Sequence, residues 1–210
     1  MDNNSYYTRN RIEMLKFLPN NFTNVIEIGC GQGEFGKLVK KSYNTIFTGI
    51  EVDPDAALVA KKHLDYVLIG DAFKQLQILP DHSFDLLICN DIIEHLASPE
   101  ILLQNIRIKM KPNSRLVCSI PNIRVLGNLI HLLINKDFEY TDDGIRDKTH
   151  LRFYTKKSIV RFLEDNGFHI EKIMGINPIK SFKTSIPLGL LQIIGHGDIR
   201  FHQFGITAKF

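Results

Sequence analysis

From Asn24 onward, short apolar runs alternate with amphipathic stretches, and this alternation constrains the fold more than any other feature of the sequence. The runs at residues 25–28, 45–50, 66–69, 84–89 and 115–120 have the length of β-strands. Helical patterns lie between several of them, and Pro54 and Pro99 stand at positions that open a helix. Strands that alternate with helices build a mainly parallel sheet with helices on both faces. The sequence therefore predicts an α/β fold.

The end of the chain departs from this alternation. Thr155 is placed to cap a helix that ends near Gly167, and two strands follow at residues 168–174 and 204–210. Because no clear crossover helix separates these strands, we expect an antiparallel pair that closes a seven-stranded sheet. Residues 5–18 have a helical pattern before the sheet. Residues 122–150 and 175–203 interrupt the pattern as two insertions within a single domain, residues 1–210.

Composition agrees with one globular domain. Of the 210 residues, 44% are hydrophobic and 23% charged, and the net charge of +3 is too small to indicate a nucleic-acid partner. Cys30, Cys89 and Cys118 lack the spacing of a zinc site or a disulfide framework, so we expect reduced core thiols. No apolar run approaches the ~20 residues that span a bilayer, and no secretory signal is evident. We therefore predict a cytoplasmic protein.

A glycine-rich turn follows the first strand, in the segment VIEIGCGQGEFG. Gly29, Gly31 and Gly33 allow a ligand to approach the main chain closely, which indicates a nucleotide-type site. The same segment also fits the GxGxxG pattern of dinucleotide-binding proteins, so an NAD(P)-dependent oxidoreductase stays an alternative. Glu27 argues against it, because a carboxylate beside the turn repels a pyrophosphate but accepts hydrogen bonds from an ammonium group.

Further polar residues follow the other strands. Glu51 ends the second strand, where a carboxylate can bind the two hydroxyls of a ribose, and Asp53 is expected to cap the next helix. Asp71 is placed either to bind an adenine amine, with the amide of Ala72 beside it, or to cap a helix. Asn90 and Asp91 follow the fourth strand, at the sheet edge where open α/β sheets bind ligands.

Five segments in order, VIEIGCGQG, GIEVD, GDA, FDLLICNDIIEHL and KMKPNSRLVCSIPN, resemble the motifs of class I S-adenosylmethionine-dependent methyltransferases. The resemblance implies a Rossmann-like sheet with an antiparallel last strand, S-adenosyl-L-methionine as cofactor and S-adenosyl-L-homocysteine as product. It implies that Glu27, Gly29, Gly31 and Gly33 bind the methionine part of the cofactor and that Glu51 binds the ribose. It also implies that Asp71 and Ala72 bind the adenine, and that the backbone near Asn90 meets the amino group. Cys30, Val52 and Asp91 belong to the same predicted site.

A narrower resemblance concerns the two segments YYTRNR and DGIRDKTHLRFYT, which are similar to a bacterial subgroup associated with cell-surface glycan or lipid biosynthesis. It implies that the acceptor is a small molecule or a glycan- or lipid-linked precursor. Tyr6, Tyr7 and Arg11 are then expected to fold over the cofactor, and the insertion at 122–150 to cover the acceptor. A core position for the tyrosines and a solvated Arg11 is the alternative.

Methylation of a hydroxyl requires alignment of donor and acceptor and removal of a proton. Two histidines fall near the expected methyl group: His95, which follows the fourth strand, and His150, which ends the 122–150 insertion and is the stronger candidate for the base or for acceptor binding. Structural roles for both are the alternative. Arg146, Asp147, Arg152 and Tyr154 surround His150 in the sequence and are candidates for a polar acceptor site.

The histidines and acids show no spacing typical of a metal site, so no metal is predicted. The apolar segment 186–194 is expected to pack on the sheet, with a homodimer contact or a lipid contact as alternatives. A non-catalytic subunit that binds S-adenosylmethionine is a further alternative to an enzyme.

Overall fold

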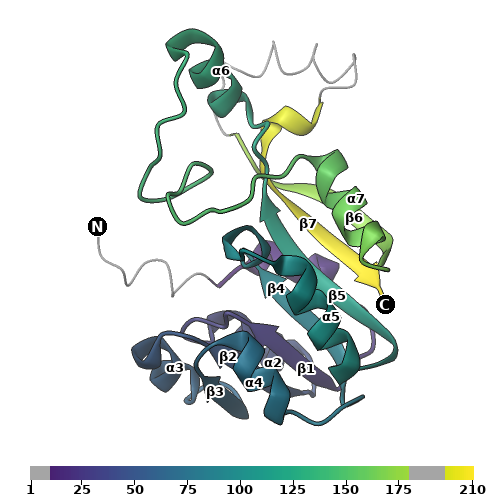
Figure 1. Cartoon of the computed structure of the whole chain (residues 1–210). Coiled ribbons are helices and arrows are strands. Elements are labelled where there is room, and N and C mark those ends of the chain that lie inside the picture. Colours follow the sequence, from purple (N-terminus) through teal and green to yellow (C-terminus); the bar gives the residue numbers. More distant parts are fainter. Residues whose placement is uncertain (1–9, 180–196) are drawn as a thin grey trace.

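A computed structural model describes residues 10–179 and 197–210 (Figure 1). Its strands are β1 Asn24–Ile28, β2 Ile46–Glu51, β3 Tyr66–Ile69, β4 Phe84–Asn90, β5 Met110–Pro121, β6 His169–Pro178 and β7 Phe201–Lys209. They form one seven-stranded sheet in the order β3-β2-β1-β4-β5-β7-β6. β1 to β5 pair in parallel, and β7 pairs antiparallel with both β5 and β6. The predicted fold class is confirmed.

β7 lies between β5 and β6, so the last strand of the chain is an inner strand of the sheet. Phe204, Ile206 and Ala208 alternate along it and are buried in the core, as a strand with neighbours on both sides requires. Gly205 faces the other side, where an added Cβ would lie 2.4 Å from the ring of Phe17. The absent side chain lets the N-terminal segment pack directly on the sheet.

Helices cover both faces of the sheet. The α-helices are α2 Glu34–Ser42, α3 Pro54–Ala60, α4 Ala72–Ile78, α5 Pro99–Lys109, α6 Leu126–Asn135 and α7 Lys156–Asp165; the 3-10 helices are η1 Ile12–Phe17, η2 Ile93–His95 and η4 Gly197–Arg200. One core cluster takes side chains from α4, α5 and α7, and a second takes them from η1, α2 and α3. Cys30, Cys89 and Cys118 are buried free thiols, as expected.

Three helical features differ from the prediction. The N-terminal helix expected at 5–18 is a short 3-10 helix in the part that the structure describes, and it follows Arg11 in a left-handed conformation (φ 51°). α4 was anticipated only as the helix that Asp71 caps in one of its two predicted roles, because seven residues carry too little periodicity to show a helix by themselves. In α5 the sequence pattern predicts that Ile101, Leu102 and Ile106 face the core, whereas the structure buries Leu102, Leu103 and Ile106 and leaves Ile101 46% exposed.

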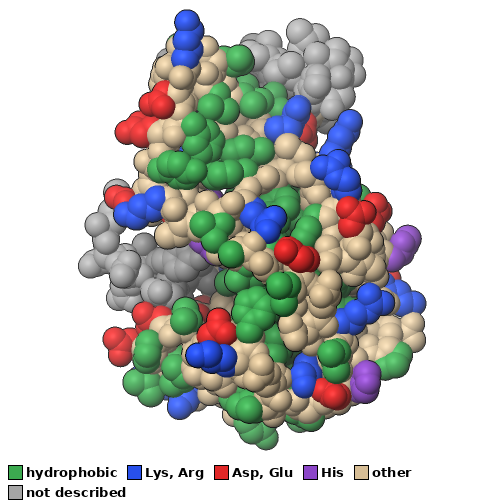
Figure 2. Space-filling view, viewed as in Figure 1, with side chains coloured by type: hydrophobic (Ala, Val, Ile, Leu, Met, Phe, Trp, Pro, Cys, Tyr) green, Lys and Arg blue, Asp and Glu red, His purple; other side chains and the backbone are tan. Residues whose placement is uncertain are grey.

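The 122–150 segment leaves the carboxyl end of β5 and arches away from the sheet (Figure 1). Buried Asn122 anchors its start, since its Nδ2 donates hydrogen bonds to the carbonyl oxygens of Asp198 and Phe201, both at 3.0 Å. The segment contains α6, where Leu133 and Ile134 are exposed, and Figure 2 shows hydrophobic side chains in this upper part of the molecule.

The second insertion begins later than expected, because β6 extends to Pro178 rather than ending at residue 174. The apolar segment 186–194 lies outside the described residues. Across residues 10–179 and 197–210, no helix has the length and apolar character needed to cross a bilayer.

Thr155 caps α7 as predicted: its Oγ1 accepts a hydrogen bond from the Ser158 amide at 3.1 Å, while Ser158 Oγ accepts one from the Thr155 amide at 2.9 Å. We expect Thr155→Ala to lower the free energy of unfolding by about 1 kcal/mol, because the Ser158 amide loses its hydrogen-bond acceptor. Thr155→Ser keeps the hydroxyl and should stay near wild type. Urea unfolding monitored by circular dichroism measures both, and equal stability of all three proteins contradicts the assignment.

Candidate active site

A cavity of about 350 Å³ opens at the carboxyl ends of β1, β2 and β4. We call it the cofactor cavity. Most residues predicted from the sequence to bind the cofactor line it, namely Arg11, Glu27, Gly29, Cys30, Gly31, Glu51, Val52, Asp71, Ala72 and Asn90. Residues that sequence reasoning did not single out complete the lining, among them Phe35, Gly70, Phe73, Ile92 and Leu96. They stand within or beside the motif segments, but motif reasoning assigned no ligand contact to their mainly apolar side chains.

The glycine turn has the backbone that its sequence predicts. Gly29, Gly31 and Gly33 have φ values of 70°, 54° and 80°, a region that side chains disfavour. Gly33 does not line the cavity; it precedes α2, and an added Cβ would lie 3.1 Å from the Ala60 backbone. Gly29 and Gly31 therefore border the ligand space, and Gly33 lets the turn pack against α3.

Glu51 holds the glycine turn in place. Its Oε2 accepts a hydrogen bond from the Gly31 amide at 2.7 Å, and its Oε1 accepts one from the Asp53 amide at 3.0 Å. Each carboxylate oxygen has two lone pairs, so both can still accept from a ribose hydroxyl. Asp53 caps α3 as predicted. Asp71 caps α4 and also lines the cavity, so the cap does not remove it from the predicted adenine end, and adenine binding stays a prediction.

Two buried polar side chains face the cavity without partners. Glu27 Oε2 and both side-chain polar atoms of Asn90 make no hydrogen bond within the described part of the chain. Burial raises the pKa of Glu27 well above its ordinary value, and the Arg11 guanidinium only partly opposes this effect. Unsatisfied buried polar atoms are costly, so these groups call for a polar ligand. An ammonium and a carboxylate, as in the methionine part of the predicted cofactor, match them.

Arg11 and Asp91 form an ion pair at the border of this cavity. Asp91 also accepts hydrogen bonds from Ser119 Oγ at 2.6 Å and from Gln203 Nε2 at 2.9 Å. These contacts turn Asp91 toward a neighbouring cavity, away from the cofactor cavity in which the sequence placed it. Tyr6 and Tyr7 lie outside the described residues.

The neighbouring cavity, about 210 Å³, is called the acceptor cavity below. It lies between the sheet edge and the loop of the 122–150 segment, and its lining comprises Asp91, Glu94, His95, Pro121, Asp143, Gly144, Ile145, Asp147, His150, His202 and Gln203. His95 lines both cavities. The cofactor cavity and the acceptor cavity therefore adjoin at the His95 side chain.

The two predicted catalytic histidines lie side by side. Their ring centroids are 4.7 Å apart in an edge-on arrangement. His95 Nδ1 lies 3.2 Å from the Thr149 carbonyl oxygen, and His150 Nδ1 lies 3.1 Å from that of Ile145. Burial, with a further contribution from His150, lowers the pKa of His95 below its ordinary value. His95 is therefore a neutral ring at neutral pH.

Glu94 is the acidic residue that sequence reasoning missed, although it stands directly before His95 in NDIIEHL. It is 1% exposed, and both carboxylate oxygens lack a hydrogen-bond partner in residues 10–179 and 197–210. Donor atoms of Glu94, His95 and His150 all lie within 4.8 Å of one another. The absence of metal-site spacing in the sequence therefore did not exclude such a cluster, because His150 reaches it from a distant part of the chain.

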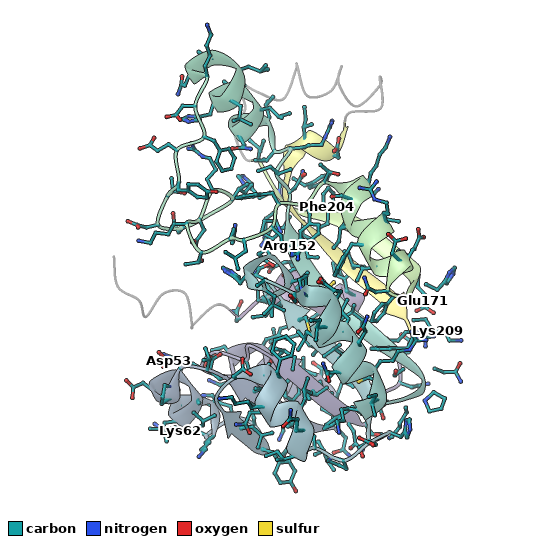
Figure 3. The ribbon with its side chains drawn as sticks, in the orientation of Figure 1. Asp53, Lys62, Arg152, Glu171, Phe204 and Lys209 are labelled. Atoms are coloured by element: carbon teal, nitrogen blue, oxygen red, sulfur yellow. The ribbon has the colours of Figure 1, made fainter. Side chains whose placement is uncertain are left out.

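The other residues near His150 in the sequence mostly point elsewhere. Asp147 lines the acceptor cavity, whereas Arg146, Arg152 and Tyr154 do not. Arg152 donates to the Ala97 carbonyl and lies 3.7 Å from Glu100, at the junction between the 122–150 segment and α5 (Figure 3). Tyr154 is buried beside Phe162. The arginine fork expected at the acceptor is thus not among the residues that line this cavity.

Comparison with known proteins shows the family of the chain. A methyltransferase domain family matches residues 3–173. The chain belongs to this family. It is 26% identical over 168 residues to a ubiquinone biosynthesis O-methyltransferase of Glaesserella parasuis, which covers 74% of this chain and 70% of that protein. A mitochondrial protein of the same name from Schizosaccharomyces pombe is 29% identical over 167 residues, covering 74% and 59%.

Among solved structures, an S-adenosylmethionine-dependent methyltransferase from Archaeoglobus fulgidus superposes with a TM-score of 0.66 at 25% identity, covering 100% of this chain and 95% of that one. The methyltransferase is therefore an enzyme of class I that uses S-adenosylmethionine, as the ordered motifs indicated. The oxidoreductase alternative is set aside, in agreement with the carboxylate of Glu27 in the cofactor cavity.

Glu27 allows a test that separates stability from binding. Because burial raises its pKa, the folded protein without cofactor keeps a proton that the unfolded chain has lost, so stability falls as pH rises above the ordinary glutamate pKa of about 4.3. Glu27→Gln removes this loss. We expect the variant to unfold at a higher temperature than wild type at pH 7, with the difference vanishing toward pH 4. Thermal unfolding across pH measures it.

The same variant should bind S-adenosylhomocysteine at least about tenfold more weakly, since a hydrogen bond to a charged group contributes about 1.5–3 kcal/mol. Glu164→Gln, an exposed position on α7, is the matched control and should change neither property. Unaltered affinity in Glu27→Gln contradicts the role given to this carboxylate.

Proposed function

We propose that this methyltransferase transfers a methyl group to the oxygen of a neutral hydroxyl, on a small molecule or on a glycan- or lipid-linked precursor. The observation that carries the proposal is that His95 lines both cavities, so a methyl donor in one meets an acceptor in the other beside a single imidazole. Relatives named O-methyltransferases support oxygen as the accepting atom.

The residues of the cofactor cavity have separate tasks in this reaction. Glu27 and Asn90 hold the amino-acid end, Glu51 the ribose, and Asp71 with the Ala72 amide the adenine. When bound, S-adenosylmethionine supplies an electrophilic methyl group on a sulfonium. The acceptor oxygen bonds to the methyl carbon as the carbon–sulfur bond breaks, and the hydroxyl proton leaves. The products are a methyl ether, S-adenosylhomocysteine and a proton.

The charge of the acceptor cavity favours a neutral acceptor. Four acids, Asp91, Glu94, Asp143 and Asp147, border the cavity, and the described residues of its lining include no lysine or arginine. Asp91 is paired with Arg11 and burial raises the pKa of Glu94, so Asp143 and Asp147 are the acids that would repel a phosphate or carboxylate at the reacting end. An anionic part of the acceptor, if present, would have to lie outside this cavity.

The 122–150 segment supplies the far wall of the acceptor cavity through Asp143, Gly144, Ile145, Asp147 and His150. We propose that it is an acceptor lid, because its residues line the acceptor cavity and none of them lines the cofactor cavity. The Glu94 carbonyl accepts hydrogen bonds from the amides of Leu151 and Arg152, at 2.9 and 3.1 Å, which fixes the end of the lid to η2.

A cytoplasmic location, a homodimer and the absence of a nucleic-acid partner stay predictions from the sequence. The non-catalytic alternative, a subunit that binds S-adenosylmethionine without turnover, is distinguished by release of S-adenosylhomocysteine in the presence of an acceptor.

We expect His150→Ala to lower turnover by roughly 100-fold or more, the span that a positioning or proton-transferring group supplies, while the affinity for S-adenosylhomocysteine changes little. Of the two cavities, His150 lines only the acceptor cavity, so its loss should lower turnover without changing the affinity for S-adenosylhomocysteine. A panel of phenols, nucleotide sugars and lipid-linked glycans, with S-adenosylhomocysteine release as readout, identifies the acceptor for this measurement. His169→Ala, exposed on β6, is the control and should keep full turnover.

Calorimetry tests the cofactor half of the proposal. S-Adenosylhomocysteine should bind the wild-type protein, whereas NAD should not, and Glu51→Ala should abolish binding because it removes both the ribose partner and the anchor of the glycine turn. Binding of NAD instead, or full turnover in His150→Ala, would contradict the proposal.

A further inference from the structure

Three potential metal ligands meet where the two cavities join. Glu94 and His95 are neighbours in η2, and His150 comes from the end of the acceptor lid. One donor atom from each side chain lies within 4.8 Å of the others. We propose that Glu94, His95 and His150 form a site for a divalent transition-metal cation, and that this cation holds the acceptor hydroxyl.

The hydrogen bonds of the two rings prepare them as ligands. Nδ1 of His95 faces the Thr149 carbonyl oxygen, and Nδ1 of His150 faces that of Ile145. A carbonyl oxygen only accepts, so each Nδ1 carries the proton and each Nε2 keeps a free lone pair. Thr149 Oγ1 also lies 3.1 Å from Nδ1 of His95, but it donates its own proton to Asp147 and accepts from the ring. Histidines that bind metals usually donate their second ring N–H to such an acceptor, which fixes tautomer and orientation. Both rings satisfy this requirement from backbone carbonyls of the lid.

Glu94 gives the second, independent observation. Its carboxylate is buried, and in the described chain neither oxygen has a hydrogen-bond partner. A buried carboxylate without a partner is costly to the fold, and the nearby carboxylate of Asp91 increases that cost. A bound cation removes it. Asp91 itself is committed to Ser119 and Gln203, so we leave it outside the ligand set.

The site is fixed before any ligand arrives. The amides of Leu151 and Arg152 both donate to the Glu94 carbonyl, which holds the residue after His150 against η2. His95 and Glu94 are consecutive, so all three ligands are attached to one hydrogen-bonded unit. A preformed site of this kind binds a cation without ordering the chain first.

The donor set indicates which cations fit. Two imidazoles with one carboxylate suit Zn²⁺, Mn²⁺, Fe²⁺ or Co²⁺ better than Mg²⁺ or Ca²⁺, which prefer oxygen ligands. Three protein ligands also leave positions open, as catalytic metal sites do. The acceptor cavity of about 210 Å³ borders all three side chains and gives room for a hydroxyl at an open position.

The use of the cation in catalysis rests on the proposed function, whereas its binding does not. A hydroxyl bound to a cation has a lowered pKa and loses its proton to water near neutral pH. The resulting oxygen bonds to the methyl carbon as the carbon–sulfur bond breaks, with no change of oxidation state. In this arrangement His95 and His150 are ligands, and neither is the proton acceptor expected from the sequence.

Direct titration tests the site. The full chain without a histidine tag is treated with EDTA, dialysed and titrated with ZnCl₂ and with MnCl₂ by calorimetry, and Co²⁺ binding is followed by visible absorption. We expect one cation per chain and a higher unfolding temperature on binding. Glu94→Gln and His150→Ala should weaken binding at least tenfold. His63→Gln is the matched control, a histidine 3.6 Å from Glu34, and should keep wild-type affinity.

Binding of S-adenosylhomocysteine is measured on every variant, because it reports an intact fold and tests the cofactor cavity separately. No cation bound by the wild-type protein, or equal affinity in Glu94→Gln, His150→Ala and wild type, overturns the cation site and leaves the proposed function standing. If the wild-type protein binds the cation but not S-adenosylhomocysteine, the proposed function is overturned and the cation site stands. Turnover of the EDTA-treated enzyme should be lost and then restored by Mn²⁺ or Zn²⁺; full turnover without a cation contradicts the catalytic use.

Discussion

The parallel course of β1, β2, β4 and β5 is the constraint on which the rest of this methyltransferase depends. Parallel strands end at one edge of the sheet, so residues that follow different strands meet there although they are far apart in sequence. Glu27, Glu51 and Asp91 gather in this way around two adjoining cavities. Backbone amides and an arginine offset part of the cost of this concentration of carboxylates near the core.

The carboxylates at this edge of the sheet differ in their hydrogen-bond partners. This difference separates the carboxylates that support the fold from those that have oxygens available for a ligand. Glu51 accepts from two backbone amides and shapes the glycine turn. Asp91 is held by Arg11, Ser119 and Gln203 and thereby joins the N-terminal segment to β5 and β7. Glu27 and Glu94 keep unpartnered oxygens that face the cofactor cavity and the acceptor cavity. We regard the first pair as structural supports and the second as the groups that await ligands.

The inner position of β7 connects the fold to the site. Gln203 lies near the start of β7, opposite Pro121 of β5, and donates to Asp91 across the acceptor cavity. Asn122, one residue beyond β5, bonds to the backbone on either side of the η4–β7 junction. The acceptor lid therefore begins from a buried anchor and ends at the Glu94 carbonyl, which leaves its loop held at both ends above the acceptor cavity.

The sequence by itself determined the sheet, the glycine turn and the identity of most residues that line the cofactor cavity, because most of these residues stand at the end of a strand or directly after it and are recognised from a local pattern. Glu27 and Gly29 follow from one strand and its turn, and Thr155 from one helix start. Only the tertiary structure decided what surrounds the acceptor. It joined Glu94 and His95 to His150 across 55 residues, turned Asp91 away from the cofactor, and kept Arg152 out of the cavity. Local patterns record which backbone a segment adopts, whereas contacts between distant segments depend on how the whole sheet and its lid pack.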